Sequence, residues 1–424
     1  MDTLIKTLNK IGICVALFAL AACNSSDKPE TETEAPTITP TTGVFSQAEE
    51  DFYDSRLKVL IAAFQSGKLT TTYDTEIAFG THLKPLPLKR GKTESLNENV
   101  ISSISDYAQL HNSDSLMIYE NGHVVFEKYF KDVTGASLIN AKSLAKPLGV
   151  IATGRAIEEG YIESLDQSAS DFIIEWKGTD KEAIRIRHIL DMRTGLLAQN
   201  YEPENRDILN RAYLHPRHDE VIIHEYPLIH PPGTRYDYSN ANSELVSILI
   251  ERATDQPYQE WLSSQVLDLL NTNGGTIWLN REGGMAHSGC CVGLTSETYM
   301  KLGILVLQQG QWDGEQVLSK SFVSEMLTPT PQNKYAGMGV YLGRHFRADR
   351  GAGNPDVSFA TTFHSEPYVD KDIVLFDGNG NQVVYILPAR NIVIMRLGGR
   401  TLKDPKWDNA FMPNLVSNHI GSKE

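Results

Sequence analysis

The pattern of apolar and polar residues predicts strands near both ends of the main domain and helices between them. Residues 115–119 and 123–130 are strand-like runs separated by Asn121-Gly122, a pair typical of a tight hairpin turn. Two further strand-like runs lie near the other end of the chain, at 382–387 and 392–397. We therefore predict an α+β fold, in which helices flank an antiparallel sheet. A mostly helical subdomain is inserted between the N- and C-terminal strands of that sheet.

The first 93 residues divide into three segments by composition. Residues 1–22 join a positive start to an apolar stretch too short to span a bilayer, as in a secretory signal peptide. Residues 23–45 are rich in Ser, Thr, Pro and Glu, so a disordered tether is predicted there. Residues 46–93 carry a helical pattern followed by a basic, proline-containing linker. The main domain is predicted to span 94–420.

A serine and a lysine stand one helical turn apart at the start of an apolar run. Ser143 and Lys146 precede residues 148–157, in which Arg155 is the first charge. Pro147 is tolerated in the first turn of a helix, so it places the helix start near Ser143. Positions i and i+3 share one helix face, which lets the two side chains meet. A buried lysine at the positive end of a helix loses basicity and can act as a general base for a serine nucleophile.

The spacing Ser-x-x-Lys also occurs by chance. It is found again in a polar tail (Ser25 and Lys28) and in a charged amphipathic segment (Ser55 and Lys58). On this tetrapeptide alone, a helix cap followed by a surface lysine is therefore the alternative interpretation.

The second candidate is the run Tyr238-Ser239-Asn240, which precedes an apolar helix entered at Leu245. A tyrosine beside a lysine can serve as a base or a proton relay, because the cation lowers the tyrosine pKa. From this run alone, a hydrogen-bonded core tyrosine is an equally good interpretation.

The net charge of the chain and its candidate metal-binding residues restrict the partners that the protein could bind. The formal net charge of −14 disfavours nucleic acid and anionic membrane surfaces as partners. Histidines cluster ahead of the tyrosine run, with Asp219 and Glu220 among them: His215, His218, His224 and His230. Their spacing matches no zinc pattern, so we predict a solvated loop or pocket rim and no metal site.

Cys290 and Cys291 are neighbours in the sequence. Adjacent Cα atoms lie ~3.8 Å apart, which is below the usual range for a disulfide. Two buried thiols are therefore predicted.

Together these motifs resemble the serine β-lactamase and penicillin-binding superfamily, specifically its class C β-lactamase-related branch of esterases and 6-aminohexanoate-dimer hydrolases. Residues 143–146 match the family's Ser-x-x-Lys, and 238–240 match its Tyr-x-Asn. Residues 186–196, which include Asp191-Met192, are similar to a structural signature of the same branch. The resemblance extends from about Glu94 to Val416.

The resemblance implies two-step acyl transfer without a metal or an organic cofactor. Ser143 would attack a carbonyl after giving its proton to the Lys146/Tyr238 pair, and water would hydrolyse the acyl-enzyme. Asn240 would orient Lys146 and the substrate amide. The backbone N–H groups of Ser143 and Asn379 would hold the oxyanion.

The last motif of the family departs from its pattern here. The family carries Lys-Thr-Gly or His-Thr-Gly, and the corresponding residues are Phe376-Asp377-Gly378. Gly378 lets substrate approach the strand closely. Phenylalanine replaces the basic residue that normally receives a substrate carboxylate. We therefore predict that Phe376 packs against an apolar group of an uncharged ester or amide.

The run Leu20-Ala21-Ala22-Cys23 resembles a bacterial lipobox, which implies cleavage before Cys23 and lipidation of its sulfur. An ordinary secretory signal with a chance cysteine is the alternative. Asn24 resembles the residue found in lipoproteins that Gram-negative bacteria sort to the outer membrane. The prediction is a lipid-anchored protein of the bacterial cell envelope, at the outer membrane and facing the periplasm.

The predicted activity is that of an envelope-anchored serine hydrolase, which cleaves a small ester, amide or peptide through an acyl-enzyme on Ser143. One alternative is a β-lactamase or a D-alanyl-D-alanine carboxypeptidase. Another is a catalytically inactive lipoprotein that binds peptidoglycan. The presence of serine, lysine and tyrosine together argues against an inactive binder, because binding requires none of that chemistry.

Overall fold

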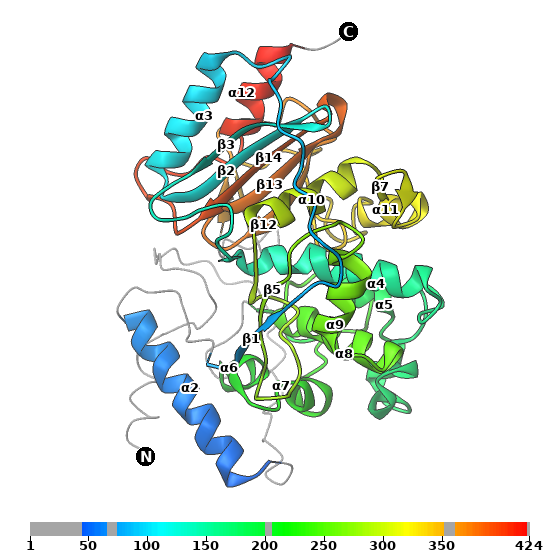
Figure 1. Cartoon of the computed structure of the whole chain (residues 1–424). Coiled ribbons are helices and arrows are strands. Elements are labelled where there is room, and N and C mark those ends of the chain that lie inside the picture. Colours follow the sequence, from blue (N-terminus) through cyan, green and yellow to red (C-terminus); the bar gives the residue numbers. More distant parts are fainter. Residues whose placement is uncertain (1–44, 66–73, 200–205, 352–360, 422–424) are drawn as a thin grey trace, which may run out of the picture.

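The computed structural model describes residues 45–65, 74–199, 206–351 and 361–421 of the 424-residue chain (Figure 1). The predicted signal peptide, most of the predicted tether and Cys23 lie outside these residues. Among the described residues, no helix combines the length and the apolar character that a membrane span requires.

The largest sheet is antiparallel and is built from both ends of the main domain. Its strand order is β3 (His123–Tyr129), β2 (Ser113–Glu120), β14 (Ile392–Gly398), β13 (Gln382–Leu387), β12 (Val374–Gly378) and β9 (Tyr341–Leu342). Asn121 and Gly122 form the predicted hairpin turn, with φ values of 47° and 95°. The pairing of β2 with β14 confirms that distant parts of the chain form the sheet.

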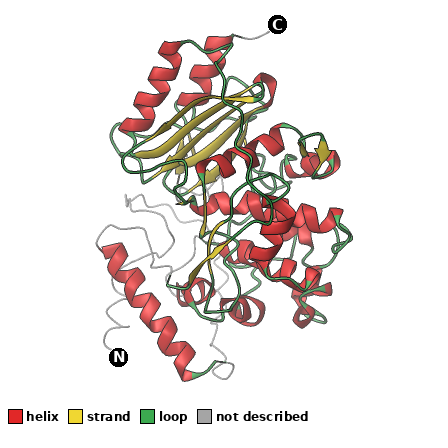
Figure 2. Cartoon of the chain, viewed as in Figure 1, coloured by secondary structure: helices red, strands yellow, loops and turns green. Residues whose placement is uncertain are grey.

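Helices cover both faces of this sheet (Figures 1 and 2). Helices α3 (Glu98–Leu110) and α12 (Phe411–Ile420) pack on one face, and α10 (Ser296–Leu307) packs on the other. In β13, Val383 and Tyr385 face α3 and α12, whereas Val384 and Ile386 face α10. The strand is therefore apolar at successive positions, since both of its faces are buried.

The inserted subdomain is mostly helical, which confirms the predicted α+β architecture. Its helices are α4 (Ala145–Glu158), α5 (Ile186–Leu190), α6 (Arg206–Leu214), α7 (His218–Glu220), α8 (Asn240–Thr254) and α9 (Tyr258–Leu262). Helix α8 begins at Asn240, five residues before Leu245, where the apolar pattern starts. Asn242, Ser243 and Glu244 lie in its first turns and are buried, so their polarity concealed the start of the helix.

The chain between the subdomain and the end of the large sheet forms shorter elements. They are α11 (Lys320–Met326), β7 (Gln311–Trp312), β8 (Glu315–Gln316), β10 (Asp349–Gly351) and β11 (Thr361–Phe363).

A second, smaller sheet connects the N-terminal extension to the serine segment. Its strand order is β1 (Glu76–Phe79), β5 (Gly275–Trp278), β6 (Val292–Leu294) and β4 (Ile139–Asn140). Helix α2 (Gln47–Gln65) packs beside α6, where Tyr53 bonds Asp207 at 2.9 Å and Arg211 bonds Glu50 at 2.7 Å. The extension therefore contributes both a helix and a strand to the folded domain.

Candidate active site

The serine lies in a tight turn between a strand and a helix. Strand β4 ends at Asn140, a 3₁₀ turn covers Lys142–Leu144, and α4 begins at Ala145. Pro147 is in the first turn of α4, as the sequence predicts. Lys142 has a φ of 57°, in the left-handed region, and such a conformation in a residue other than glycine is often found at functional sites. The turn leaves Ser143 partly exposed while Lys146 is buried.

The structure brings together the three residues predicted to be catalytic. Ser143 Oγ lies 3.0 Å from Tyr238 Oη, and Lys146 Nζ donates to Ser143 Oγ at 3.1 Å. Lys146 Nζ also donates to Gly289 O at 2.8 Å and to Asn240 Oδ1 at 3.3 Å. The amine is thus held by three acceptors, one of which is the candidate nucleophile.

Burial sets the proton affinities of the two candidate bases in opposite directions. Desolvation lowers the pKa of Lys146 to about 7, although the negative charge of Glu244 partly opposes this. Desolvation raises the pKa of Tyr238 well above its usual value, and the hydrogen bond from Ser143 offsets only part of the change. The expectation that the lysine lowers the tyrosine pKa is therefore wrong. Near neutral pH the lysine can supply a free base, whereas the tyrosine stays protonated.

Strand β12 borders the serine turn at Gly378. A Cβ at this position would overlap with Ala141 O and would come within 2.7 Å of Leu144 Cδ1, so only glycine permits the contact. Asn379 follows at the end of the strand and is partly exposed, and its backbone carbonyl accepts a bond from Gln382 at 3.2 Å. Gly378 therefore contacts the serine turn, and Asn379 is the next residue along the chain.

Phe376 does not line the site. Its side chain is 1% exposed and belongs to the main hydrophobic core, so the prediction that it packs against a substrate group is wrong. Asp377, the next residue, lies close enough to Tyr238 for its negative charge to raise the tyrosine pKa. Burial raises the pKa of Asp377 itself to about 6, and its carboxylate lies 3.5 Å from Arg350.

Sequence reasoning missed three residues around the site. Arg350 is buried, stacks 3.8 Å from the ring centroid of Tyr341 and pairs with Asp377. Gly289 supplies the carbonyl that holds Lys146, and Glu244 influences the lysine through its charge. None of these residues lies in a recognisable motif. Of the three, only Glu244 could have been predicted from the sequence to lie near the site. It follows Asn240 by four residues and so shares its helix face.

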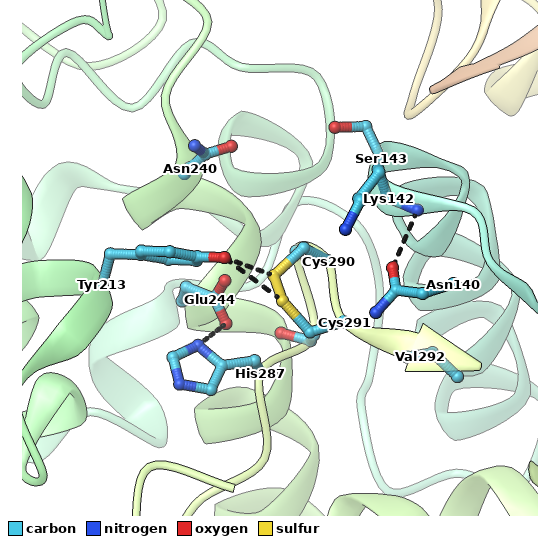
Figure 3. Close-up of a disulfide and its surroundings, with 12 residues drawn as sticks. Asn140, Lys142, Ser143, Tyr213, Asn240, Glu244, His287, Cys290, Cys291 and Val292 are labelled. Atoms are coloured by element: carbon cyan, nitrogen blue, oxygen red, sulfur yellow. Dashed lines mark hydrogen bonds and ion pairs between the residues drawn. A yellow bond between two sulfur atoms is a disulfide. The ribbon is translucent and has the colours of Figure 1, made fainter. Parts of the chain in front are cut away.

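The histidines and cysteines also differ from expectation. His215 and His218 are fully buried, so the predicted solvated loop is wrong for them, whereas the His224 side chain is 43% exposed. Cys290 and Cys291 form a disulfide rather than two thiols, with their Cα atoms 3.7 Å apart (Figure 3). Cys291 has a φ of 67°, a local backbone conformation that the sequence does not disclose.

Comparison with known proteins identifies the family of the chain. A family model described as Beta-lactamase matches residues 104–406. A 6-aminohexanoate-dimer hydrolase from Paenarthrobacter ureafaciens is 24% identical over 229 residues, which cover 51% of this chain and 57% of that relative. The match therefore spans less than two thirds of the relative's length.

Solved structures show the same fold. A putative 6-aminohexanoate-dimer hydrolase from Bacillus anthracis superposes with a TM-score of 0.60 and 16% identity, covering 82% of this chain and 90% of that one. EstCE1, described as a hydrolase with promiscuous acyltransferase activity, gives a TM-score of 0.53 and 15% identity, covering 76% and 97%. The family model covers most of the chain, and the fold agrees with it, so the chain belongs to the Beta-lactamase family.

Proposed function

We propose that this protein is a lipid-anchored hydrolase of the bacterial envelope, which cleaves an uncharged ester or amide through an acyl-enzyme on Ser143. The acyl-enzyme rests on the position of Ser143 Oγ, within hydrogen-bond distance of both Lys146 Nζ and Tyr238 Oη. The lipid anchor rests on the run that ends at Cys23. A nucleophile that shares hydrogen bonds with a base and a proton relay is the arrangement that serine acyl transfer requires.

In the first step, neutral Lys146 accepts the proton of Ser143 while Oγ forms a bond to the substrate carbonyl carbon. The developing oxyanion is held by the backbone N–H groups of Ser143 and Asn379. The bond to the leaving alcohol or amine then breaks. Tyr238 donates its proton to that leaving group and recovers one from Lys146. In the second step, water repeats the sequence at the acyl-enzyme and releases the acid.

The preference for uncharged substrates rests on Asp377. This carboxylate lies near Tyr238 and forms an ion pair with the Arg350 guanidinium. The corresponding strand in the resembled family carries a cation instead. A substrate carboxylate would meet an anion and a guanidinium that is already paired. β-Lactams and D-alanyl-D-alanine peptides both carry such a carboxylate, so we rank those activities below a neutral ester or amide. The curated relative named as a 6-aminohexanoate-dimer hydrolase makes linear amides worth including among the substrates tested.

The test combines active-site labelling with a hydrolysis screen on the detergent-solubilised full chain. A fluorophosphonate probe should label the wild type and Ser55→Ala, but not Ser143→Ala. Ser55 is a matched control, because it also precedes a lysine by three residues but lies on α2, where it bonds Phe52 O at 2.7 Å. Loss of labelling in Ser143→Ala with an unchanged thermal melt supports the nucleophile. Labelling that persists in this variant would refute the assignment.

The screen compares a neutral nitrophenyl ester, a linear amide dimer and a chromogenic cephalosporin. Faster turnover of the ester or the amide supports the proposed substrate class. Cephalosporin hydrolysis with the highest kcat/KM would favour the β-lactamase alternative. A labelled serine with no turnover of any of the three substrates would favour the binding lipoprotein.

A further inference from the structure

A second cluster of ionisable side chains is buried near the candidate active site. His218 comes from α7, Glu244 from α8, and His287 from the segment that leads to β6. Their exposed fractions are 0%, 1% and 0%. Glu244 Oε2 lies 3.8 Å from His218 Nε2 and 3.5 Å from His287 Nδ1, and Figure 3 shows the second contact. Three separate elements thus bring two imidazoles and one carboxylate together.

The imidazole nitrogens of this cluster lack hydrogen bonds. Both ring nitrogens of His218 and both ring nitrogens of His287 are buried without a hydrogen-bond partner, whereas the backbone N–H groups of Ser288 and Gly289 favour the ionised form of the Glu244 carboxylate. Most buried polar groups in proteins are satisfied, and an unsatisfied one costs about 1–3 kcal/mol or more when it is charged. Four such nitrogens in one place, beside a buried carboxylate, indicate that the cluster binds a further partner.

The neighbouring cations do not take that role. Arg56 is paired with Asp74 at 2.7 Å, and Arg281 donates to Pro216 O at 2.8 Å. Lys146 donates to Gly289 O, Ser143 and Asn240. Each of these cations therefore donates its hydrogen bonds to other groups, and the ion-pair contacts of Glu244 are with the two histidines.

The surroundings would hold the histidines as ligands. Trp278 stacks on His287 with ring centroids 4.1 Å apart, and His287 stacks on His218 at 4.2 Å. Arg56 of α2 lies 5.0 Å from the Trp278 ring centroid, so the N-terminal extension covers this stack.

We propose that His218 Nε2, His287 Nδ1 and the Glu244 carboxylate bind one divalent transition-metal ion of the zinc type. Two imidazoles and one carboxylate form a ligand set that Zn²⁺ uses in proteins, with water completing the coordination. Bonds of about 2.0–2.1 Å place tetrahedral ligand atoms about 3.3 Å apart. The carboxylate lies 3.5 and 3.8 Å from the two imidazoles, and the three groups offer ligand atoms within 4.8 Å of one another. Binding would therefore require the groups to close on the ion and the stacked rings to rotate, which turns both nitrogens toward it.

The ion would act as a structural clamp. His287 precedes Ser288 and Gly289, and the Gly289 carbonyl holds Lys146. Binding His287 and Glu244 together would fix this segment against α8, which also carries Asn240. The ion would touch no reacting atom, but it would stabilise the segments around the site and offset the charge of Glu244 that acts on Lys146.

The test uses the untagged, detergent-solubilised full chain, stripped with dipicolinate and titrated with Zn²⁺ against a chromophoric chelator. We expect one tight equivalent by elemental analysis, a visible absorption band when Co²⁺ replaces Zn²⁺, and a Zn²⁺-dependent rise in the Tm of the wild type. His287→Ala and Glu244→Gln should each weaken binding by at least about 100-fold. His224→Ala is the matched control, because His224 belongs to the same histidine-rich stretch but is exposed, and it should bind as the wild type does.

A wild type that holds no stoichiometric Zn²⁺ in the competition titration and shows no rise in Tm would overturn the proposal. So would equal binding by the wild type and both ligand variants, because the ion would then be bound elsewhere on the protein. If the ligand variants fail to fold, the wild-type stoichiometry and the Co²⁺ spectrum decide the question.

Discussion

Replacing Asn240 with aspartate would test whether Lys146 acts as a neutral base. Asn240 Oδ1 accepts a hydrogen bond from Lys146 Nζ at 3.3 Å. The substitution keeps the shape of the side chain and adds a negative charge beside the amine. An adjacent carboxylate favours the ammonium form, so the pKa of Lys146 should rise.

The size of the effect follows from the burial of the lysine. With a pKa of about 7, about half of the molecules carry the neutral amine at pH 7. For a lysine in water the fraction is roughly one in three thousand. A carboxylate at this distance raises a neighbouring pKa by about 1–3 units, to about 8–10. The neutral fraction at pH 7 then falls by about 5-fold to 500-fold, and kcat/KM should fall with it.

The assay is the pH dependence of kcat/KM for a neutral chromogenic ester, with the rate of phosphonate labelling as a second readout. Because the neutral amine is the active form, the rate should rise with pH through the pKa and then level off. In Asn240→Asp this rise should occur at higher pH, and activity should recover in alkaline buffer. Asn240→Ala, which removes the amide without adding charge, should keep the inflection near that of the wild type. An Asn240→Asp profile that is lower at every pH, with an unmoved inflection, would refute Lys146 as the base.

Three further predictions concern the rest of the chain. Asp377→Asn frees the guanidinium of Arg350 to bind a substrate carboxylate. The ratio of kcat/KM for a cephalosporin to kcat/KM for a neutral ester should then rise by about tenfold, since a charge-assisted bond contributes about 1.5–3 kcal/mol. An unchanged ratio would exclude Arg350 as the carboxylate partner. Phe376→Ala should lower the free energy of unfolding by about 3–5 kcal/mol in a denaturant melt, because the side chain is in the core; a change of substrate preference without loss of stability would contradict this. Cys23→Ser should move the protein from the membrane fraction to the soluble fraction, and native protein without an acyl mass at its N-terminus would refute the anchor.

Local sequence signals predicted the elements that depend on near neighbours. The Asn121-Gly122 turn and its two strands were predictable, because a tight hairpin needs residues that tolerate positive φ. The start of α4 was predictable to within two residues, because Pro147 fits only a first helical turn. The i and i+3 spacing placed Ser143 and Lys146 together, since helix geometry fixes that contact.

The position of Phe376 could not be read from its motif. Helices cover both faces of this sheet, so alternation along the strand does not say which residues face a core and which face the substrate. The helices that cover the sheet come from other parts of the chain, and they place Phe376 in the core. The burial of His215 and His218 could not be predicted from the sequence either, because segments distant in the chain pack around them.

The sequence by itself determined the fold class, the hairpin, the strands of the large sheet and the candidate Ser-x-x-Lys and Tyr-x-Asn motifs, because short-range stereochemistry encodes them. Only the tertiary structure decided what those side chains can do. The pKa of Lys146 falls, and that of Tyr238 rises, because the folded chain removes both groups from water. Likewise, His218, Glu244 and His287 meet only because α7, α8 and the segment before β6 converge, although up to 69 positions separate these residues in the sequence.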